Sequence, residues 1–288
     1  MPELPEVETI AQDLQTLILD KEIASVSVKW ERIIFCPTPD EFRRLLVGRR
    51  IVSISRRGKY LMAQLSDGNY LLVHLRMTGQ LLTSPPAEKD RKHVHVVFEF
   101  DDGTSLYYAD LRKFGRFYLV SDTQPLLGGL GPEPLSPSFS ADELHKRLSK
   151  RKQRIKPLLL DQHFIAGLGN IYVDESLHRA KIHPLRRASE LSREETVCLY
   201  DSIVAILSAA IASRGTTLSD YRDAKGNLGS HQNDLQVFRK AGQPCPRCGH
   251  PIERLVVAQR GTYICPACQP LQAQDTANCD SHSLLVSI

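Results

Sequence analysis

The spacing of hydrophobic positions changes once along the chain, and this change separates two kinds of structure. Near the N-terminus apolar residues recur at helical spacing and predict a buried helix; they are Val7, Ile10, Ala11, Leu14, Leu17 and Ile18. Residues 22–120 then show short runs of β-branched and aromatic residues, separated by turn signals such as Asp67-Gly68-Asn69. The runs lie at 24–28, 60–65, 70–75, 94–100 and 117–120. Several short strands at this spacing predict a β-sandwich or barrel.

Proline and glycine gather in residues 121–139, which predicts a linker. Helical patterns follow at roughly 140–150, 155–163, 170–180 and 192–213. The expected fold class is therefore α+β, with an N-terminal β-sandwich, its flanking helix, and a helical second half. We expect a first domain over residues 1–133, a helical domain over 140–240, a small unit over 241–270 and a loose tail over 271–288.

Composition and length are those of an ordinary soluble protein of two domains. Five acidic residues in the first twenty exclude a secretory signal. The longest apolar stretch, near 203–212, is shorter than the roughly 20 residues that a membrane helix needs. We therefore expect a cytoplasmic protein without a membrane partner.

The net charge of +4 decides little, but the basic residues are unevenly placed. Residues 42–59 hold seven basic residues and no acid, and residues 144–160 again hold seven and no acid. A solvated helix face usually intersperses both signs, so these two runs favour a surface that contacts phosphates.

Two pairs of cysteines have the spacing of a metal site. Cys245-Pro-Arg-Cys248 and Cys265-Pro-Ala-Cys268 are separated by sixteen residues, and 252–258 with 262–264 read as a hairpin between them. Four thiolates build a closed tetrahedral site for one structural zinc ion. A pair of disulfides is the alternative, and a cytoplasmic location argues against it. The remaining cysteines, Cys36, Cys198 and Cys279, are expected to be ordinary buried or tail thiols.

The first residues, MPELPEVE, place a proline directly after the initiator methionine. Once Met1 is removed, Pro2 carries a free secondary amine with Glu3 beside it, at the mouth of the predicted helix. The alternative interpretation is that Pro5 is a first-turn proline and that the acids complement the helix dipole.

Six blocks of sequence carry a resemblance to one family. They are PELPEVE at the start, RRGKYL at 56–61, HLRMTGQL at 74–81, DLRKFG at 110–115, GLGNIYVDE at 167–175 and QRGTYICPACQ at 259–269. In this order they closely resemble the formamidopyrimidine-DNA glycosylases, bacterial repair enzymes that excise oxidised purines. The resemblance covers about residues 1–270. It implies a helix–two-turn–helix motif in the helical domain, a zinc ribbon, and double-stranded DNA with oxidised bases as the partner.

The resemblance also implies a mechanism. In that family the amine matched by Pro2 attacks the sugar carbon that bears the damaged base, a Schiff base forms, and elimination cuts the strand on both sides. Glu3 would move protons, Lys59 would assist base opening and β-elimination, and Arg260 on the zinc hairpin would contact phosphate and serve the second elimination. An α-amino group has a pKa of about 7.7–8.0, and a helix N-terminus and a nearby cation such as Lys59 both favour its neutral form. Glu6, one turn after Glu3, is expected to order this terminus.

Extraction of a nucleotide from a duplex leaves a void and an unpaired base. The resemblance implies that Met77, Arg112 and Phe114 fill this void, and their chemistry is suitable, since they offer an adaptable side chain, paired donors and a wedge. Outside their blocks, Met77 and Phe114 would more often be core residues. Further contacts with phosphate or sugar are implied for His93, Arg151, Lys156 and Asn170.

The chain departs from the common pattern in GNLGSHQNDLQVFRKAG at 226–242, where many relatives carry an aromatic pair at the positions of Ser230 and His231. This neighbourhood covers the displaced base in the family, so the resemblance supports the mechanism more firmly than the lesion preference.

The leading hypothesis is a monomeric, bifunctional DNA glycosylase and lyase of base excision repair, acting in the cytoplasm at the nucleoid. It would remove 8-oxoguanine and formamidopyrimidines and cut by β,δ-elimination. One alternative is the endonuclease VIII branch, which favours oxidised pyrimidines and usually has glycine where this chain has Leu4. The other is a non-catalytic zinc-ribbon protein that binds damaged DNA; the intact Pro2, Glu3 and Lys59 count against it.

Overall fold

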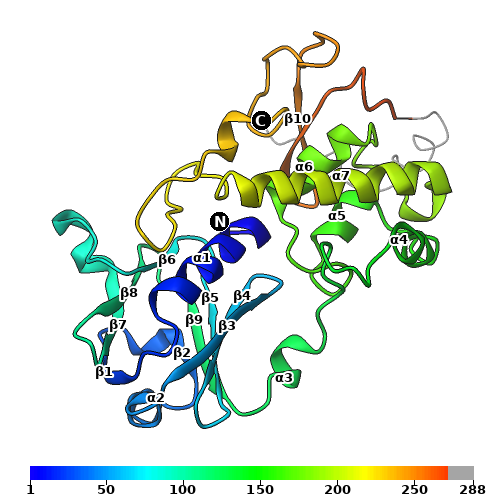
Figure 1. Cartoon of the computed structure of the whole chain (residues 1–288). Coiled ribbons are helices and arrows are strands. Elements are labelled where there is room, and N and C mark those ends of the chain that lie inside the picture. The colour runs from blue at the N-terminus through cyan, green and yellow to red at the C-terminus, as the bar shows by residue number, and fades with distance from the viewer. Residues whose placement is uncertain (272–288) are drawn as a thin grey trace. The chain divides into compact units, whose positions relative to one another are not determined.

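The computed structural model describes residues 1–271 and is drawn in Figure 1. These residues divide into two compact units. The first comprises Met1–Leu130 and Ser208–Asp234, and the second comprises Gly131–Leu207 and the described residues from Leu235 onward. The segment Ser208–Asp234 thus packs with the N-terminal residues, whereas the sequence placed it in the helical domain. The expected tail after residue 271, with Cys279, lies outside the described residues.

Helix α1 (Leu4–Leu17) begins almost at the first residue because its first turn is well capped. Glu3 and Glu6 form a capping box, in which the Glu3 N–H donates to Glu6 Oε2 at 2.8 Å. Pro5 lies in the first turn, where its missing N–H has no partner to lose. The face that carries Val7 and Leu14 is buried, as predicted. The interpretation of Pro5 and the acids as helix-capping residues is therefore correct. It is compatible with a chemical role for the same N-terminus.

Two sheets form the first unit (Figure 1). The antiparallel four-stranded sheet has the order β1 (Ile23–Val28), β7 (Val94–Phe100), β8 (Ser105–Asp110) and β6 (Gly79–Leu82). The five-stranded sheet has the order β2 (Ile34–Cys36), β9 (Arg116–Val120), β5 (Tyr70–His74), β4 (Tyr60–Leu65) and β3 (Ile51–Arg57). Only the pairing of β2 with β9 is parallel among these described strands.

Both sheets, α1 and helix α2 (Pro39–Leu46) contribute to one hydrophobic core. At its centre the rings of Phe42, Phe98 and Phe117 lie with centroids 6.1–6.5 Å apart. The predicted sandwich with a flanking helix is confirmed, although the predicted runs did not include α2 or the strands β2, β3, β6 and β8. Short elements complete the unit: the 3₁₀ turns η1 (Glu31–Ile33), η2 (Glu88–His93) and η4 (His231–Asn233), and helix α3 (Gln124–Leu127) within the expected linker.

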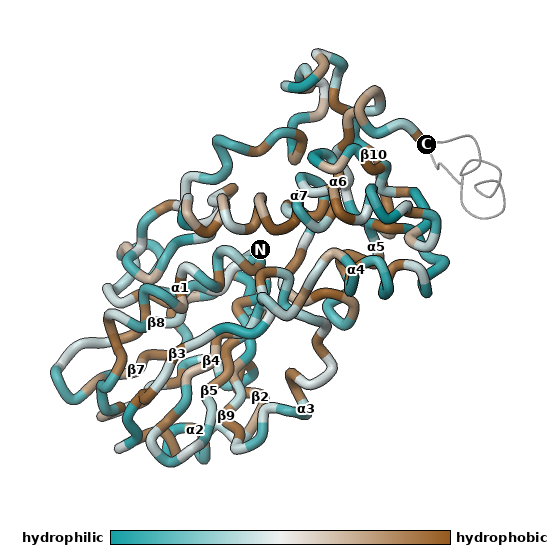
Figure 2. Tube along the Cα trace, turned by 45° about the vertical axis from the view of Figure 1, so that its right-hand side comes forward, coloured by the Kyte–Doolittle hydropathy of each residue, from teal (hydrophilic) through white to brown (hydrophobic). Residues whose placement is uncertain are grey.

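The second unit is mainly helical, as predicted. Its elements are α4 (Ala141–Leu148), α5 (Ile155–Leu160), α6 (Asn170–Arg179), η3 (Ala188–Glu190) and most of α7 (Arg193–Ala212). Figure 2 shows hydrophobic residues along α7 and on the strands of the sandwich.

Helix α7 corrects one expectation about membranes. Its 20 residues are long and apolar enough to span a bilayer by length and composition, although the apolar stretch at 203–212 alone is too short. A core helix passes the same test, so this is weak support for a span. Leu199, Ile203 and Leu207, spaced as one helical stripe, are buried in the protein.

The predicted hairpin between the cysteine pairs is present as β10 (Glu253–Val257) and β11 (Arg260–Ile264). Ala258 and Gln259 form its two-residue turn, with φ values of 49° and 60°. Positive φ at both positions matches the twist of a type I′ hairpin. Arg260 follows the turn directly and is exposed.

Candidate active site and metal centre

Two glutamates at the start of α1 fix the N-terminus. Glu3 and Glu6 are 2% and 1% exposed. Glu6 Oε1 accepts a hydrogen bond from the Thr216 N–H at 2.8 Å, while Oε2 accepts the one from Glu3. Pro2 is buried, whereas Met1 is exposed. Glu6 therefore orders the terminus, as the sequence indicates, and it ties α1 to the segment that follows α7.

Lys59 lies in the turn between β3 and β4, directly after Gly58 with its φ of 55°. On β5, burial and the nearby cations Arg76 and Lys59 together lower the pKa of His74 to about 3. The neutral ring accepts a hydrogen bond from the Arg76 N–H at Nδ1, at 3.0 Å. This part of the sheet therefore keeps its histidine uncharged beside fixed cations, an arrangement suited to an anionic partner.

The structure brings Met77, Arg112 and Phe114 together at the surface. The Arg112 guanidinium lies 4.7 Å from the centre of the Phe114 ring, and its Nη1 lies 3.6 Å from Met77 Sδ. Met77 and Phe114 are 39% and 49% exposed. They are thus not core residues, and two exposed apolar side chains next to a cation form a tip that can enter a stack of bases.

Asp110, whose role no sequence pattern indicated, holds this tip. The carboxylate is 1% exposed and accepts four hydrogen bonds, from Thr78 Oγ1, Arg112 N–H, Gly115 N–H and Tyr108 Oη, at 2.5–3.1 Å. Gly115 must lack a side chain, because a Cβ there would lie 1.6 Å from Tyr108 Oη. The DLRKFG block is therefore a loop built on one buried carboxylate.

The first basic run is mostly paired with acids from elsewhere in the chain. The ion pairs join Arg43 to Glu31 and Asp40, Arg49 to Asp67, Arg50 to Glu22, and Arg56 to Glu8. The expectation of a phosphate-binding surface does not hold for these four residues. In the second run, by contrast, Lys150, Arg151 and Lys152 are exposed.

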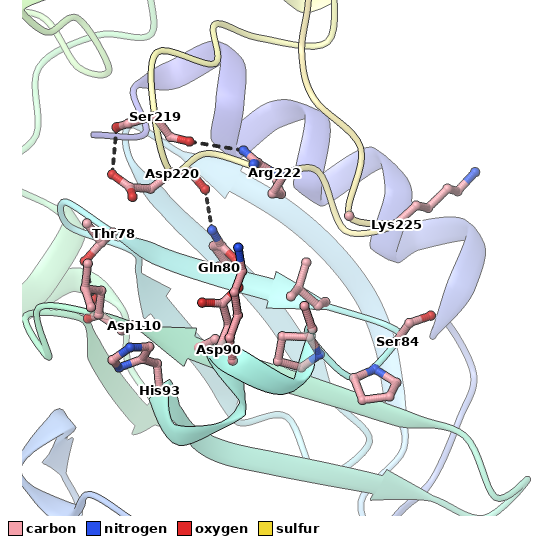
Figure 3. Close-up of a pocket in the computed structure, with 18 residues that line it drawn as sticks. Thr78, Gln80, Ser84, Asp90, His93, Asp110, Ser219, Asp220, Arg222 and Lys225 are labelled. Atoms are coloured by element: carbon pink, nitrogen blue, oxygen red, sulfur yellow. Dashed lines mark hydrogen bonds between the residues drawn. The ribbon is translucent and has the colours of Figure 1, made fainter.

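A cavity of about 490 Å³ opens in the first unit, between β6, β8, η2 and the segment 219–226 (Figure 3). Its size lies within the range of small-molecule sites, about 300–1,000 Å³. Its polar lining includes Gln80, Asp90, His93, Ser219, Asp220 and Arg222. Gln80 Nε2 donates to the Asp220 carbonyl and so joins β6 to the opposite wall (Figure 3).

Ser230 and His231 do not line this cavity. The Ser230 N–H donates to Ser213 O at 2.9 Å and the His231 N–H to Gly215 O at 3.2 Å, so they close the base of the segment 213–231. His231 is 5% exposed, and burial lowers its pKa. The departure from the family's pattern thus lies at the attachment of this segment.

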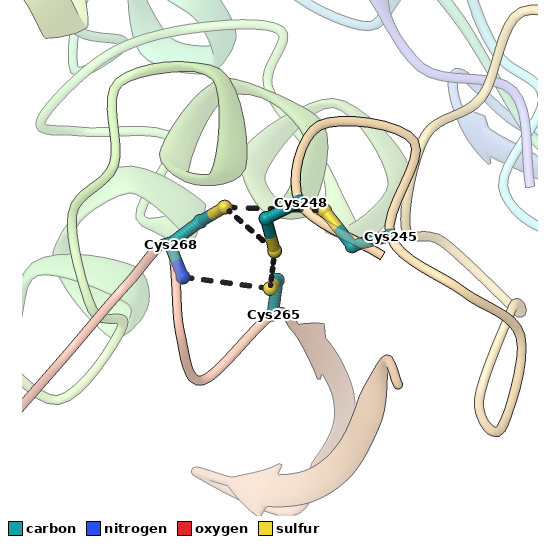
Figure 4. Close-up of side chains that lie close together, drawn as sticks. All are labelled: Cys245, Cys248, Cys265 and Cys268. Carbon is teal, nitrogen blue, oxygen red and sulfur yellow. Dashed lines mark hydrogen bonds between the residues drawn. The ribbon is translucent and has the colours of Figure 1, made fainter. Parts of the chain in front are cut away.

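The four predicted ligand cysteines converge in the second unit (Figure 4). All four Sγ atoms lie within 4.8 Å of one another; the Cys248–Cys265 and Cys248–Cys268 pairs are 3.4 Å apart and Cys245–Cys268 3.9 Å. Zinc–sulfur bonds of about 2.3 Å in a tetrahedron place sulfurs about 3.8 Å apart. The geometry and donor set fit one structural zinc ion. Cys36 and Cys198 are exposed, not buried as expected.

Two buried side chains tie the zinc site to helix α6 and to Ile182, which follows that helix. Gln269, fully buried, donates to Ile182 O at 2.8 Å and accepts from the Cys265 N–H at 3.0 Å. His178, 2% exposed, places Nε2 3.5 Å from Cys245 Sγ. These contacts surround the thiolates with polar hydrogen-bonding groups.

Lys156 corrects another expectation. It is fully buried, and its Nζ donates to Asp174 Oδ1 at 2.6 Å, Thr262 Oγ1 at 2.8 Å and Gly261 O at 3.3 Å. An ammonium has three N–H donors, so this geometry contradicts the expected contact with phosphate. Burial raises the pKa of Asp174, and Lys156 opposes that rise. The pair instead holds the hairpin that carries Arg260.

Asn170 shares this role. It is the first residue of α6, after Gly169 as N-cap, so it is not itself the cap. Its Nδ2 donates to Gly261 O at 2.8 Å, beside the bond from Lys156. Next to Asp174, Glu175 accepts the N–H groups of residues 236–238 at 2.8–3.0 Å. Two adjacent acids at the end of the largely apolar GLGNIYVDE block, together with its Asn170, were the available signal for these buried contacts.

Three family models match the chain in succession. Residues 1–117 match the formamidopyrimidine-DNA glycosylase N-terminal domain, residues 130–222 match that family's H2TH domain, and residues 242–271 match a model described as a zinc finger found in FPG and IleRS. Fold and site thus define a β-sandwich protein with an H2TH domain and a zinc finger.

Similar proteins match almost the whole chain. The formamidopyrimidine-DNA glycosylase of Protochlamydia amoebophila is 48% identical over 274 residues, 93% of this chain and 99% of that protein. A crystal structure of a Lactococcus lactis FPG mutant with Fapy-dG containing DNA matches with a TM-score of 0.86 and 41% identity, over 94% of this chain and 100% of that one. The same organism's Fpg with abasic-site DNA matches with a TM-score of 0.86 and 41% identity, over 93% and 100%. The chain belongs to the formamidopyrimidine-DNA glycosylase family.

Proposed function

We propose that this protein is a bifunctional glycosylase and lyase of base excision repair, which removes oxidised purines from double-stranded DNA and cuts the strand there. The observation that carries the proposal is the N-terminal arrangement, in which Pro2 precedes a buried Glu3 at the start of α1 and Glu6 fixes that start through Thr216. The DNA in the Lactococcus lactis complexes, with Fapy-dG or an abasic site, supports this class of substrate.

The nucleophile in this proposal is the Pro2 amine, freed by removal of Met1. Its nitrogen bonds to C1′ of the damaged nucleotide as the bond from C1′ to the base breaks, and the base leaves with a proton. Ring opening, with a proton delivered to the ring oxygen, then gives an iminium ion between Pro2 and the sugar, the Schiff base of a secondary amine. Glu3, one residue away and buried, supplies and removes protons in these steps. The N-terminus of α1 favours the neutral amine that the attack requires.

Strand cutting follows from the imine. Loss of a C2′ proton breaks the C3′–O bond, and loss of a C4′ proton breaks the C5′–O bond. We assign Lys59 to the first elimination and Arg260 to phosphate contact during the second. Arg260 is exposed on a hairpin turn whose position zinc and Lys156 hold. Since arginine is a poor proton donor, its charge is its main contribution.

We further propose that Met77, Arg112 and Phe114 fill the void in the duplex. His93, Arg151 and Asn170 would contact the DNA backbone. We keep a catalytic domain (1–133), a helical domain (140–240) and a zinc ribbon (241–270) as the proposed functional parts, although residues 208–234 of the helical domain pack with the first unit. The protein would act as a monomer in the cytoplasm, at the nucleoid.

Borohydride trapping tests the nucleophile. Mature protein starting at Pro2 should become covalently attached to DNA with a formamidopyrimidine lesion, and peptide mapping should place the sugar remnant on Pro2. A peptide tag fused before Pro2 should abolish the adduct, while the same tag at the C-terminus should leave it intact. A fully active N-terminally tagged protein, or a remnant on another residue, would refute the mechanism.

The alternatives give different results. A non-catalytic damage-binding protein forms no adduct with any lesion. An enzyme of the endonuclease VIII type releases oxidised pyrimidines faster than formamidopyrimidine bases from matched duplexes. Leu4, fully buried as the first residue of α1, occupies the position at which that branch usually has glycine.

A further inference from the structure

One arginine joins the helix of the proposed nucleophile to a distant loop segment. Arg214 Nη2 donates to Asp13 Oδ2 on α1 and to Asp223 Oδ2, each at 2.6 Å, and its Nε also donates to Asp223 at 3.1 Å. The Asp13 and Asp223 side chains are 6% and 1% exposed. Arg214 adopts the left-handed conformation, with φ of 58°, which is uncommon for a residue other than glycine.

Asp223 is the centre of a tight turn. Its Oδ1 accepts the N–H groups of Lys225 and Asn227 at 3.0 and 2.8 Å, and its own N–H donates to Asn227 O at 3.0 Å. Burial alone would raise the pKa of Asp223, but Arg214 and Asn227 outweigh burial and the pKa falls. Asp13 joins this turn a second time, because its Oδ2 also accepts the Ala224 N–H at 3.3 Å.

The same segment forms one wall of the 490 Å³ cavity. Residues 219–226 face β6, and the Ala224 carbonyl accepts the Thr83 N–H at 2.9 Å beyond the end of that strand. The segment is therefore fixed to the sandwich on one side. On the other side it is fixed to α1 twice, through Glu6 with Thr216 and through Asp13 with Arg214.

The location of the cavity suggests what it receives. Thr78, on one wall, follows Met77 of the exposed tip, and the opposite wall continues from Thr216, which Glu6 holds. A base must leave the duplex stack before its bond to the sugar can be attacked, and it then needs a pocket with polar groups for its edges. Gln80, Ser219 and Arg222 offer such groups in a cavity of sufficient size.

We propose that Arg214, Asp13 and Asp223 form a positioning network, which sets the wall of a cavity that holds the displaced base and aligns it with the N-terminus of α1. The inference rests on the proposed function. It assigns the network to base removal and not to strand cutting, because DNA that already contains an abasic site has no base to place. Arg214 is a positioning residue and takes no part in bond making.

The test compares two substrates with one variant. Arg214→Gln should lower single-turnover release of a formamidopyrimidine base about tenfold, and should leave cleavage of pre-formed abasic-site DNA within about twofold of the starting protein. Arg214→Lys should recover only part of the loss, since a single ammonium cannot present a fork to two carboxylates. Arg43→Gln is the matched control, because Arg43 bridges Glu31 and Asp40 in the same unit; it should change neither rate.

Hydrogen exchange measures the network without any substrate. The amides of residues 224–227 should exchange faster in Arg214→Gln than in the starting protein. If Arg214→Gln folds poorly, Asp13→Asn serves as the second variant, and the same amides should exchange faster in it. Unchanged exchange overturns the network, as does an equal loss of activity on both substrates. If the unaltered protein releases no base from any lesion, the proposed function fails, and the exchange result still decides whether the network exists.

Discussion

The two units hold their functional segments by different means. In the first, buried carboxylates accept backbone N–H groups: Glu6 holds Thr216, Asp110 holds the tip loop, and Asp223 holds its own turn. In the second, four cysteines around a metal support the hairpin that carries Arg260, in addition to the buried Lys156–Asp174 pair. The apolar cluster beside the metal is small, formed by Val237 and Ile252 with two of the cysteines. Buried carboxylates thus hold segments in both units, and a metal is added where the apolar core is small.

Removal of zinc should have the largest effect, and it should affect the two units differently. A chelator that strips the metal should unfold the ribbon and abolish measurable binding to lesion DNA, because Arg260 loses its support, while the sandwich keeps its circular dichroism. Metal content and affinity measured on the same sample check this. Unchanged affinity in demonstrably zinc-free protein would show that the hairpin is dispensable.

Lys156→Met should give the next largest effect, on stability. The substitution leaves Asp174 buried without its cation, which costs about 3–5 kcal/mol of unfolding free energy. The double variant Lys156→Met with Asp174→Asn should recover part of this loss, because an amide oxygen still accepts the Tyr263 N–H. Denaturant unfolding gives both values.

The exposed Lys152 is the matched control for Lys156. Lys152→Gln should leave stability unchanged and make the salt dependence of DNA binding shallower. If Lys156→Met were as stable as the starting protein and only its DNA binding were weaker, the result would support a direct contact between Lys156 and phosphate and contradict its buried role.

Asp110→Asn should have an intermediate effect within the first unit. The amide can accept some of the four hydrogen bonds but lacks the charge, and hydrogen bonds to charged groups contribute about 1.5–3 kcal/mol each at most. The melting temperature should fall, and affinity for lesion duplex should fall more than affinity for single strands, which present no void to fill. Equal losses on both kinds of DNA would mean that the tip does not enter the stack.

His178→Phe should give the smallest change, a faster loss of zinc. The ring lies 3.5 Å from Cys245 Sγ, and removal of such an outer hydrogen bond typically weakens metal binding about tenfold or more. Release of zinc to a chromogenic chelator measures it. His178→Gln, which can still donate to sulfur, should fall between the two; identical release from all three proteins would exclude a role for this contact.

Local patterns predicted much of this structure from sequence. Runs of β-branched and aromatic residues located β1, β4, β5, β7 and β9, helical spacing located α1 and α4 to α7, and two short cysteine pairs located the metal. Each of these signals lies within a few residues. The site residues could be predicted because the blocks that contain them resemble a known family. Met77, Arg112 and Phe114, which were predicted in this way, are in contact in the structure.

What escaped prediction depends on partners far away in the chain. Asp13 and Arg214 are separated by 201 residues, and Lys156 and Thr262 by 106. Charge alone cannot distinguish an arginine that faces solvent from one that meets a carboxylate elsewhere in the chain, so four residues of the first basic run were misinterpreted. The return of 208–234 to the N-terminal unit was invisible for the same reason, because α7 shows one uninterrupted helical pattern.

Gly115 has a consequence for protein engineering. Tyr108 fills the space that a side chain at position 115 would need. Any residue larger than glycine there would therefore have to displace Tyr108, which lies on β8. Phe114 of the tip and the neighbouring Leu111, which is 57% exposed, carry no such constraint. The exposed residues could therefore be replaced while the buried support of Gly115 and Tyr108 is kept. Libraries restricted to positions 111 and 114 should yield folded variants that differ in which gaps in a double helix they detect.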